Sequence, residues 1–356
     1  MQTSTAGLQI CLGTPTVVFQ PKESNPSRQP TFVLYWINNA NAVIYLLFTT
    51  FSILNRSTHF ASPLHPLKAL YDVPAPAKLN LFLHITGRRP EGYHLLQSVF
   101  MLSDWCDTLH FELRKDGQIS RTDLSNPNNH QTSTSEKLPA QDLTVRAAHA
   151  LKAACGTSLG VHISLEKRIP SQAGMGGGSS DAASCLLALQ RLWGVRLPTE
   201  DLKKLALSLG ADVPFFLSGG HAWVEGIGEK ITPIALPASQ FLVVKPASGL
   251  STENIFRAKN LNRDTTTAIL EGFAAKTNDQ IFKFGYNDLQ PVAQVLCPQI
   301  VQSLDWLSEH QLEGRMTGSG SAVFARMLHE VDLHQAPEGW QIRKCNNLET
   351  HPLAGW

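Results

Sequence analysis

The segment from Pro170 to Ser184, PSQAGMGGGSSDAAS, limits what this chain can fold into more than any other stretch. Its glycines are Gly174, Gly176, Gly177 and Gly178. The run before it, VHISLEKRI, alternates polar and apolar residues as a half-buried strand does. The run after it has apolar residues at helical spacing, namely Ala182, Leu186, Leu189 and Trp193. The sequence therefore predicts a strand, a glycine loop and a helix in succession, with the helix N-cap at Ser179 or Ser180.

Such a loop can bind a phosphate group. Glycine leaves the backbone amides unshielded, the first N–H groups of the following helix have no partner within it, and the helix dipole favours negative charge there. A flexible linker would not join a strand directly to an amphipathic helix. A plain packing turn stays open, although it would need only one glycine. The loop lacks the lysine of a Walker motif, and Ser179 stands where the dinucleotide fingerprint has its third glycine.

The first 70 residues differ in composition from the rest of the chain. Residues 31–54 carry no charge and are long enough to cross a bilayer, but asparagines at positions 38, 39 and 41 would be costly in hydrocarbon. The stretch also lacks the layout of a secretory signal. We interpret residues 1–71 as a disordered extension or a start-site artefact. A membrane anchor and a docked structural element are the alternatives.

Composition narrows the class of protein. Apolar residues make up 43% of the chain and charged residues 17%, and the net charge is +1, so nothing indicates a nucleic-acid partner. The six cysteines are scattered without a CxxC pair or metal-ligand spacing, which favours a reduced, cytoplasmic chain without a protein metal site. Strand and helix patterns mix without strict alternation, which favours an α+β fold. We expect domains at residues 72–238 and 239–356, and a polar surface loop at residues 114–141.

Three segments resemble the signature motifs of the GHMP kinases, the superfamily of galactokinase and of homoserine, mevalonate and phosphomevalonate kinases. They are PAPAKLNLFLHITGRRPEGYH (residues 74–94), PSQAGMGGGSSDAA (residues 170–183) and RMTGSGSAVFA (residues 315–325). The resemblance covers about residues 73–356. It implies a two-domain α+β fold, with a ribosomal-protein-S5-like nucleotide domain followed by a ferredoxin-like domain. It also implies that ATP is held between the two, accompanied by Mg²⁺.

Further segments narrow the resemblance within this superfamily. They are GYH (residues 92–94), LGADVPFFLSGGHAWVEGIGE (residues 209–229) and NNLETHPL (residues 346–353). They are similar to the branch that phosphorylates the 2-hydroxyl of a cytidine diphosphate-linked methylerythritol in the non-mevalonate synthesis of isoprenoid precursors. The implied partner is that small molecule, without nucleic acid or membrane, and the implied state is a monomer or homodimer.

Three rival functions stay open. The first is another kinase of the superfamily, of the homoserine or mevalonate type. The second is a nucleotide-binding regulator that has kept the fold without turnover. The third is a membrane-attached kinase that uses residues 31–54.

The resemblance assigns catalysis to Lys78 and Asp212. Taken alone, Asp212 is a turn residue or helix cap, and Lys78 is a solvated charge on a strand. In the family's pattern, Asp212 accepts the proton of the attacking hydroxyl. An ordinary aspartate has a pKa of about 3.9, far below that of an alcohol, so proton transfer is late or Asp212 mainly orients the hydroxyl. Lys78 would keep Asp212 ionised and stabilise the developing charge.

The resemblance also assigns binding residues. Asn80 lies on the same strand face as Lys78 and would bind substrate by a hydrogen bond. Tyr93, His94 and Phe256 would stack on or hydrogen-bond the cytosine ring, although taken alone Tyr93 and His94 read as plain packing. The ATP residues would be Lys167, Pro170, Ser171, Gln172, Ala173, Gly174, Met175, Gly176, Gly177, Gly178, Ser179 and Ser180.

Two further features bear on the site. Asp142 and Asp181 depart from the family's pattern, which often has asparagine at these positions. The third motif, Thr317–Ser321, would contact the substrate or take part in loop closure over the site.

Overall fold

The computed structural model describes residues 67–124, 139–333 and 336–356. This part of the chain starts with two long antiparallel strands, β1 (Ala69–Arg88) and β2 (His94–Arg114). The alternating run AKLNLFLHITG (residues 77–87) by itself predicts a shorter first strand, and SVFMLSDWCDTLHFEL (residues 98–113) predicts two separate strands. Both predictions are wrong. The pair shifts register at four points, and such irregularities bend a strand without ending it. Each strand can therefore contribute to more than one buried cluster.

Within the described residues, six strands form the first sheet. Its neighbours run β3–β4–β2–β5–β6, and β1 pairs with β2. The additional strands are β3 (Ile119–Leu124), β4 (Gly160–Glu166), β5 (Ala222–Gly226) and β6 (Lys230–Pro233). Strand β3 lies inside the predicted polar loop and pairs in parallel with β4. Its side chains are half-buried or exposed, so it lacks the apolar alternation that indicates a strand. Residues 125–138 of that predicted loop lie outside the described residues.

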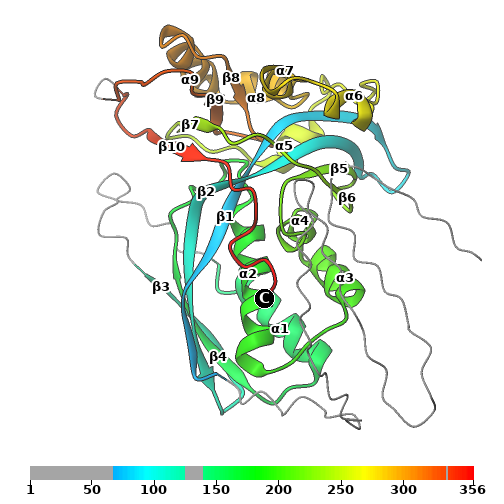
Figure 1. The fold of residues 1–356 in the computed structure, drawn as a ribbon, viewed down its shortest axis with the longest axis vertical. Coiled ribbons are helices and arrows are strands. Elements are labelled where there is room, and N and C mark those ends of the chain that lie inside the picture. The colour runs from blue at the N-terminus through cyan, green and yellow to red at the C-terminus, as the bar shows by residue number, and fades with distance from the viewer. Residues whose placement is uncertain (1–66, 125–138, 334–335) are drawn as a thin grey trace, which may run out of the picture. The chain divides into compact units, whose positions relative to one another are not determined.

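Four helices pack beside this sheet (Figure 1): α1 (Leu143–Cys155), α2 (Gly177–Trp193), α3 (Thr199–Leu209) and α4 (Val213–Leu217). Helix α2 is central, because it contacts β1, β2 and the other three helices. Its predicted apolar face is confirmed, since the following side chains are all buried: Ala182, Leu186, Leu189 and Trp193. The alanine-rich residues 142–155 predict a helix that starts at Asp142. This is confirmed, because the Asp142 side chain caps α1 by accepting the Val145 N–H at 3.0 Å.

In the described part of the chain, a second sheet has four antiparallel strands in the order β10–β7–β9–β8. They are β7 (Gln240–Lys245), β8 (Gly314–Met316), β9 (Val323–Arg326) and β10 (Gln341–Asn346). The segment RMTGSGSAVFARM (residues 315–327) predicts a strand, a glycine turn and a second strand, and β8 and β9 confirm this. Between β7 and β8 the chain contains α5 (Thr252–Arg257), α6 (Leu270–Ala274), α7 (Asn278–Lys283), α8 (Gln290–Leu296) and α9 (Pro298–Glu309).

The last ten residues leave the second sheet and return to the first. The Leu348 N–H donates to the Leu102 carbonyl at 3.0 Å, and Leu353 is buried in the cluster around α2. The Arg191 guanidinium lies 4.6 Å from the centre of the Trp356 ring, and Figure 1 shows the C-terminus beside α1 and α2. The chain therefore passes between the two sheets twice, from β6 to β7 and again after β10. The predicted domain boundary between residues 238 and 239 stays a prediction.

The predicted extension, residues 1–71, overlaps the first sheet at its last three residues and otherwise stays a prediction. Strand β1 takes residues 69–71 into the first sheet. None of the helices in the described residues is both long enough and apolar enough to cross a membrane. Residues 31–54, considered above as a membrane anchor, lie outside the described residues.

Candidate active site

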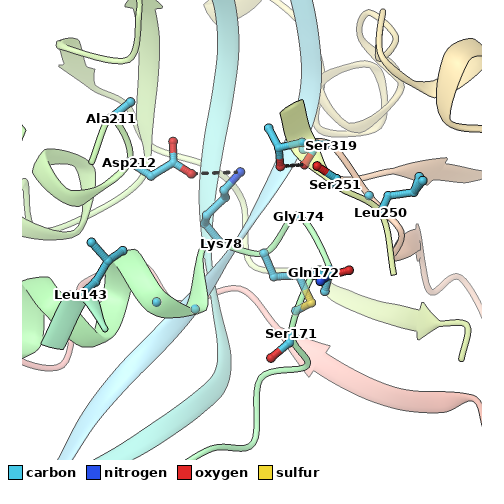
Figure 2. A pocket seen from close by; sticks show the side chains of 18 of the residues that line it. Lys78, Leu143, Ser171, Gln172, Gly174, Ala211, Asp212, Leu250, Ser251 and Ser319 are labelled. Atoms are coloured by element: carbon cyan, nitrogen blue, oxygen red, sulfur yellow. Dashed lines mark hydrogen bonds and ion pairs between the residues drawn. The ribbon is translucent and has the colours of Figure 1, made fainter. Parts of the chain in front are cut away.

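One pocket gathers residues from distant parts of the sequence. Its volume is ≈ 960 Å³. It is lined by β1, the start of β2, the glycine loop before α2, the turn before α4, residues 250–256 and residues 318–320. Every site residue predicted from the sequence lies on its lining, apart from Ser179 and Ser180. Figure 2 shows part of this lining, with Lys78 and Asp212 pointing toward each other and the glycine loop beside them.

The glycine loop turns directly into α2. The helix begins at Gly177, and its N-cap is Gly176 in the left-handed region at φ 72°. The predicted N-cap at Ser179 or Ser180 was therefore wrong. Gly176 has no side chain that could cap the helix. The first hydrogen bond of the helix runs from the Ser180 N–H to the Gly176 carbonyl at 2.9 Å. The earlier amides of the helix can then point to a ligand, while the side chain of Ser180, within α2, is buried.

The third motif supports the glycine loop from behind. The N–H groups of Ser321 and Ala322 donate to the carbonyls of Gln172 and Ala173, at 2.9 and 3.2 Å. A Cβ at Gly174 would come within 2.2 Å of the Thr317 carbonyl oxygen, so only glycine permits this approach. The loop is held by backbone contacts, which keeps its amides in a defined position.

Lys78 and Asp212 form the ion pair of the pocket. The Lys78 Nζ lies 3.7 Å from Asp212 Oδ2. Lys78 extends from β1 and is 3% exposed. Asp212 immediately precedes α4, and its side chain is 32% exposed. The buried amine and the accessible carboxylate together place a fixed positive group beside a proton acceptor that a substrate hydroxyl could reach.

The buried amine of Lys78 contacts an aromatic ring and a side-chain amide besides Asp212. The amine lies 4.7 Å from the centre of the Phe100 ring and donates a hydrogen bond to Asn80 Oδ1. Asn80 is itself held by the Thr317 hydroxyl, which accepts its backbone N–H at 2.9 Å. Burial lowers the pKa of Lys78, and the nearby Asp212 opposes that shift without reversing it.

Lys167 lies at the edge of the pocket in a different environment. Its amine pairs with Asp107 and, at 2.7 Å, with Asp181. Asp107 also accepts the N–H groups of Arg168 and Ile169, at 2.6 and 2.7 Å. Burial disfavours the charged amine, but the two carboxylates outweigh it and raise the pKa of Lys167 above its ordinary value. Burial also raises the pKa of Asp181, and Asp107 adds to this shift.

Asp142, which stands where the family often has asparagine, forms an ion pair in this structure. Besides capping α1, its Oδ1 lies 2.7 Å from Nη1 of Arg121, and the Arg121 side chain is 8% exposed. Arg121 also pairs with Asp123 at 2.8 Å, so Asp142 is the second carboxylate on that guanidinium. Asp142 therefore belongs to an ion pair at the border of the pocket.

The other end of the pocket is aromatic. Tyr93 is 62% exposed there. The rings of His94 and Phe256 pack with their centres 4.8 Å apart. The structure thus brings the three predicted cytosine-binding residues to one wall, with Asn80 and Lys78 deeper along β1.

Sequence reasoning missed two residues, Asp107 and Arg263. Asp107 is fully buried and shares the inward face of β2 with Trp105, Leu109 and Phe111. That alternation is visible in the sequence and would have marked Asp107 as a buried carboxylate in need of a partner. Arg263 donates a hydrogen bond to His94 at 3.0 Å. It lies far along the chain from that histidine and outside any motif.

Comparisons with known proteins agree with this site. The family model described as the GHMP kinases N terminal domain matches residues 142–220, and the GHMP kinases C terminal model matches residues 266–345. A protein of Polaromonas sp. (strain JS666 / ATCC BAA-500), named 4-diphosphocytidyl-2-C-methyl-D-erythritol kinase, is 75% identical over 294 residues. The alignment covers 82% of this chain and 95% of that protein. A relative of the same name from Albidiferax ferrireducens is 63% identical, with 82% and 96% covered.

Solved structures give the same result. A crystal structure of 4-(cytidine 5'-diphospho)-2C-methyl-D-erythritol kinase matches with a TM-score of 0.61 and 32% identity, covering 77% of this chain and 98% of that one. Homoserine kinase from Cytophaga hutchinsonii matches with a TM-score of 0.57 but 14% identity, over 83% of this chain and 98% of that one, which shows the common fold alone. The two-domain α+β fold expected from the motifs is confirmed. The chain therefore belongs to the GHMP kinase family and is an ATP-dependent small-molecule kinase.

Proposed function

We propose that this kinase transfers the γ-phosphate of ATP to the 2-hydroxyl of 4-diphosphocytidyl-2-C-methyl-D-erythritol, in the non-mevalonate synthesis of isoprenoid precursors. The observation that supports this most is the combination within one pocket of three elements. A glycine loop lies at one side, the Lys78–Asp212 pair at 3.7 Å lies in the middle, and aromatic residues form the other wall. The names of the curated relatives support the choice of substrate.

ATP would bind with its phosphates on the glycine loop. The amides at the start of α2 and the positive end of the helix favour an anion there. The residues we assign to ATP are those from Pro170 to Gly178, whereas Ser179 and Ser180 would act by shaping the helix start. Lys167 would lie beside the phosphates, but Asp107 and Asp181 already balance its charge, so its main contribution would be to hold these two carboxylates in place.

Asp212 and Lys78 would carry out the transfer. The substrate hydroxyl would hydrogen-bond to Asp212, which accepts its proton late in the reaction. Lys78 would stabilise the charge that develops on the attacking oxygen and the phosphoryl group. Burial lowers the pKa of Lys78, and the negative phosphates of ATP would favour its charged form again. Catalysis would rest on positioning and charge stabilisation, without a phosphoenzyme.

Mg²⁺ would enter with ATP. The described residues contain no cluster of three or more His, Cys, Asp or Glu side chains that could hold a metal ion. This fits Mg²⁺, which keeps several waters and is held largely by substrate phosphates with one or two carboxylates. Asp181 Oδ1 is the fitting protein oxygen, because within the described residues it is buried without a hydrogen-bond partner. When bound, Mg²⁺ would neutralise charge on the transferred phosphoryl group.

The cytidine group would bind the aromatic wall. Tyr93 and Phe256 offer ring faces for stacking, and His94 offers a ring nitrogen at the pocket surface. Asn80 would orient the substrate beside Lys78. The near-neutral charge of the chain supports a small-molecule partner without nucleic acid, and we propose that the enzyme acts in the cytoplasm as a monomer or homodimer.

A substrate panel with ATP and Mg²⁺ tests the proposal. The purified chain is offered the cytidyl substrate, homoserine and mevalonate, and ADP release is measured for each. We expect turnover of the cytidyl substrate alone, with a new phosphomonoester on its tertiary carbon by ³¹P NMR. Turnover of homoserine or mevalonate but not the cytidyl substrate would identify another kinase of the superfamily. ATP binding without turnover of any compound would indicate a regulator.

A further inference from the structure

Arg263 is tied to the aromatic wall by every nitrogen of its guanidinium. Its Nε donates to Nε2 of His94 at 3.0 Å. Its Nη1 donates to the Leu261 carbonyl at 3.0 Å, and its Nη2 donates to the carbonyls of Phe256 and Ala258 at 3.0 and 2.8 Å. Arg263 itself does not line the pocket in the described residues. It therefore acts on the pocket through His94 and through the backbone that carries Phe256.

These contacts decide which nitrogen of His94 carries the proton. A guanidinium has only donors, so Nε2 of His94 must accept. In the neutral ring the proton then sits on Nδ1. Burial lowers the pKa of His94, and the charges of Arg263 and Arg88 lower it further, which keeps the ring neutral.

The remaining nitrogen is free to meet a ligand. Among the described residues no group forms a hydrogen bond with Nδ1 of His94, and the residue lines the pocket. Its ring is steadied on one side by Phe256, with the ring centres 4.8 Å apart. The wall thus presents one oriented N–H donor beside two stacking surfaces.

We propose that Arg263 is a positioning residue that holds His94 as its Nδ1–H tautomer and so makes the pocket select cytosine over uracil. This rests on the proposed function, because it assumes that the nucleobase lies against His94. Position 3 of cytosine is a bare acceptor, whereas position 3 of uracil carries a hydrogen. A fixed donor pairs with the first and opposes the second, and a donor that the wrong base covers without pairing weakens binding of that base.

The tautomer can be measured without any ligand or turnover. The ring nitrogens of histidine report the tautomer through their ¹⁵N shifts, and a His94→Gln variant identifies the His94 signals among the 13 histidines. We expect the Nδ1–H form in the wild-type protein and a mixture of tautomers in Arg263→Met. The Nε2–H form in the wild type would overturn the proposal, as would an unchanged tautomer in Arg263→Met.

Base selectivity is measured by titrating CMP and UMP while following the His94 ring signals, which report this pocket alone. We expect the wild type to prefer CMP, and Arg263→Met to lose about tenfold of that preference, as for the loss of one or two net hydrogen bonds. Arg257→Met is the matched control, because this arginine on α5 is 76% exposed and pairs only with Glu253 in the described structure. It should retain the wild-type preference.

A double variant separates positioning from a general effect on the fold. In a His94→Gln background, CMP and UMP binding is followed by calorimetry, because the His94 signals are absent, and Arg263→Met should leave the remaining CMP preference unchanged. Arg263 also holds the Phe256 backbone, but stacking on Phe256 does not distinguish the two bases, so the preference depends on the His94 contact. An equal further loss in that background would contradict the proposal. A wild-type protein with His94 in the Nδ1–H form that binds neither nucleotide would support the tautomer assignment and contradict the proposed substrate.

Discussion

Lys78 is buried and Lys167 is partly buried, and both line the same pocket, yet their environments are opposite. Lys78 has a single carboxylate at 3.7 Å, and that carboxylate is partly open to the pocket. Lys167 has two carboxylates, which are 0% and 2% exposed. Burial therefore prevails at Lys78 and lowers its pKa, whereas ion pairing prevails at Lys167 and raises it.

This difference separates a group kept for chemistry from a group that holds structure. Removing Lys78 would leave no buried partner unsatisfied, because Asp212 is accessible and Asn80 Oδ1 keeps the Thr317 hydroxyl at 3.3 Å. Removing Lys167 would leave two buried carboxylates without their cation. The charge of Lys78 is only partly compensated in the free protein, and a substrate phosphate can supply the missing negative charge when it binds.

The largest expected effect is on turnover. Lys78→Met and Asp212→Asn should each lower kcat about 10³-fold, because each removes a group that stabilises charge or accepts a proton in the transition state. The double variant should be little worse than either single one, since the two residues act as a unit. The test is ADP release in single-turnover assays, with ATP binding and circular dichroism as checks of the fold. Near-wild-type kcat in either single variant would remove these residues from catalysis.

The second effect is on stability, and it concerns the other lysine. Lys167→Met should lower the free energy of unfolding by about 3 kcal/mol, because Asp107 and Asp181 then remain buried without a cation. This value is at the low end for a broken buried pair, since Lys167 is 24% exposed. Urea unfolding measures the change. Lys204→Met, on an amine that is 76% exposed and pairs with Asp201 on the surface, should unfold like the wild type. An equally stable Lys167→Met would show that the cluster is not structural.

The sequence predicted the parts of this comparison unevenly. The glycine loop and the helix after it followed from spacing alone, because they are local features. Lys78 and Asp212 needed the family resemblance, since 134 positions separate them and only the fold brings them to 3.7 Å. Asp107 was missed, although the alternating apolar residues of β2 would have placed it on the inward face of that strand. Its partner Lys167 was predicted to contact phosphate, and no pattern in the chain indicated that two carboxylates already surround it.

A third effect reverses the usual outcome of mutation at a buried site. Lys78→Met should raise the free energy of unfolding by about 1–2 kcal/mol while it removes activity, since replacing a poorly compensated buried charge with an apolar side chain of similar length is commonly stabilising. The lowered pKa of Lys78 in the folded state means that the wild-type protein becomes more stable as the pH rises toward the ordinary lysine pKa. The advantage of Lys78→Met over the wild type should therefore shrink over that range. Urea midpoints of the wild type and variant at pH 7 and pH 9.5 give both numbers. A destabilised Lys78→Met would mean that Asp212 and Phe100 compensate the ammonium fully.

The smallest expected effect concerns Asp181, because Lys167 carries one positive charge and is paired with two carboxylates. Burial and Asp107 raise the pKa of Asp181, so its folded-state pKa exceeds the unfolded value. Such a group contributes stability that is complete below the unfolded pKa and is lost as the pH rises through the folded pKa. Asp181→Asn removes this penalty, and its amide oxygen can still accept the Lys167 hydrogen bond.

We therefore expect Asp181→Asn to match the wild type near pH 4 and to become more stable by about 1 kcal/mol at pH 7. The surface variant Asp201→Asn, whose side chain is 55% exposed, should show no such pH dependence. A variant that is less stable than the wild type at pH 7 would mean that Asp181 is ionised at little cost and that Lys167 needs both carboxylates. In that case the two lysines would differ only in the number of their partners, and the spare carboxylate oxygen of Asp181 would be held ready for the cation that accompanies ATP.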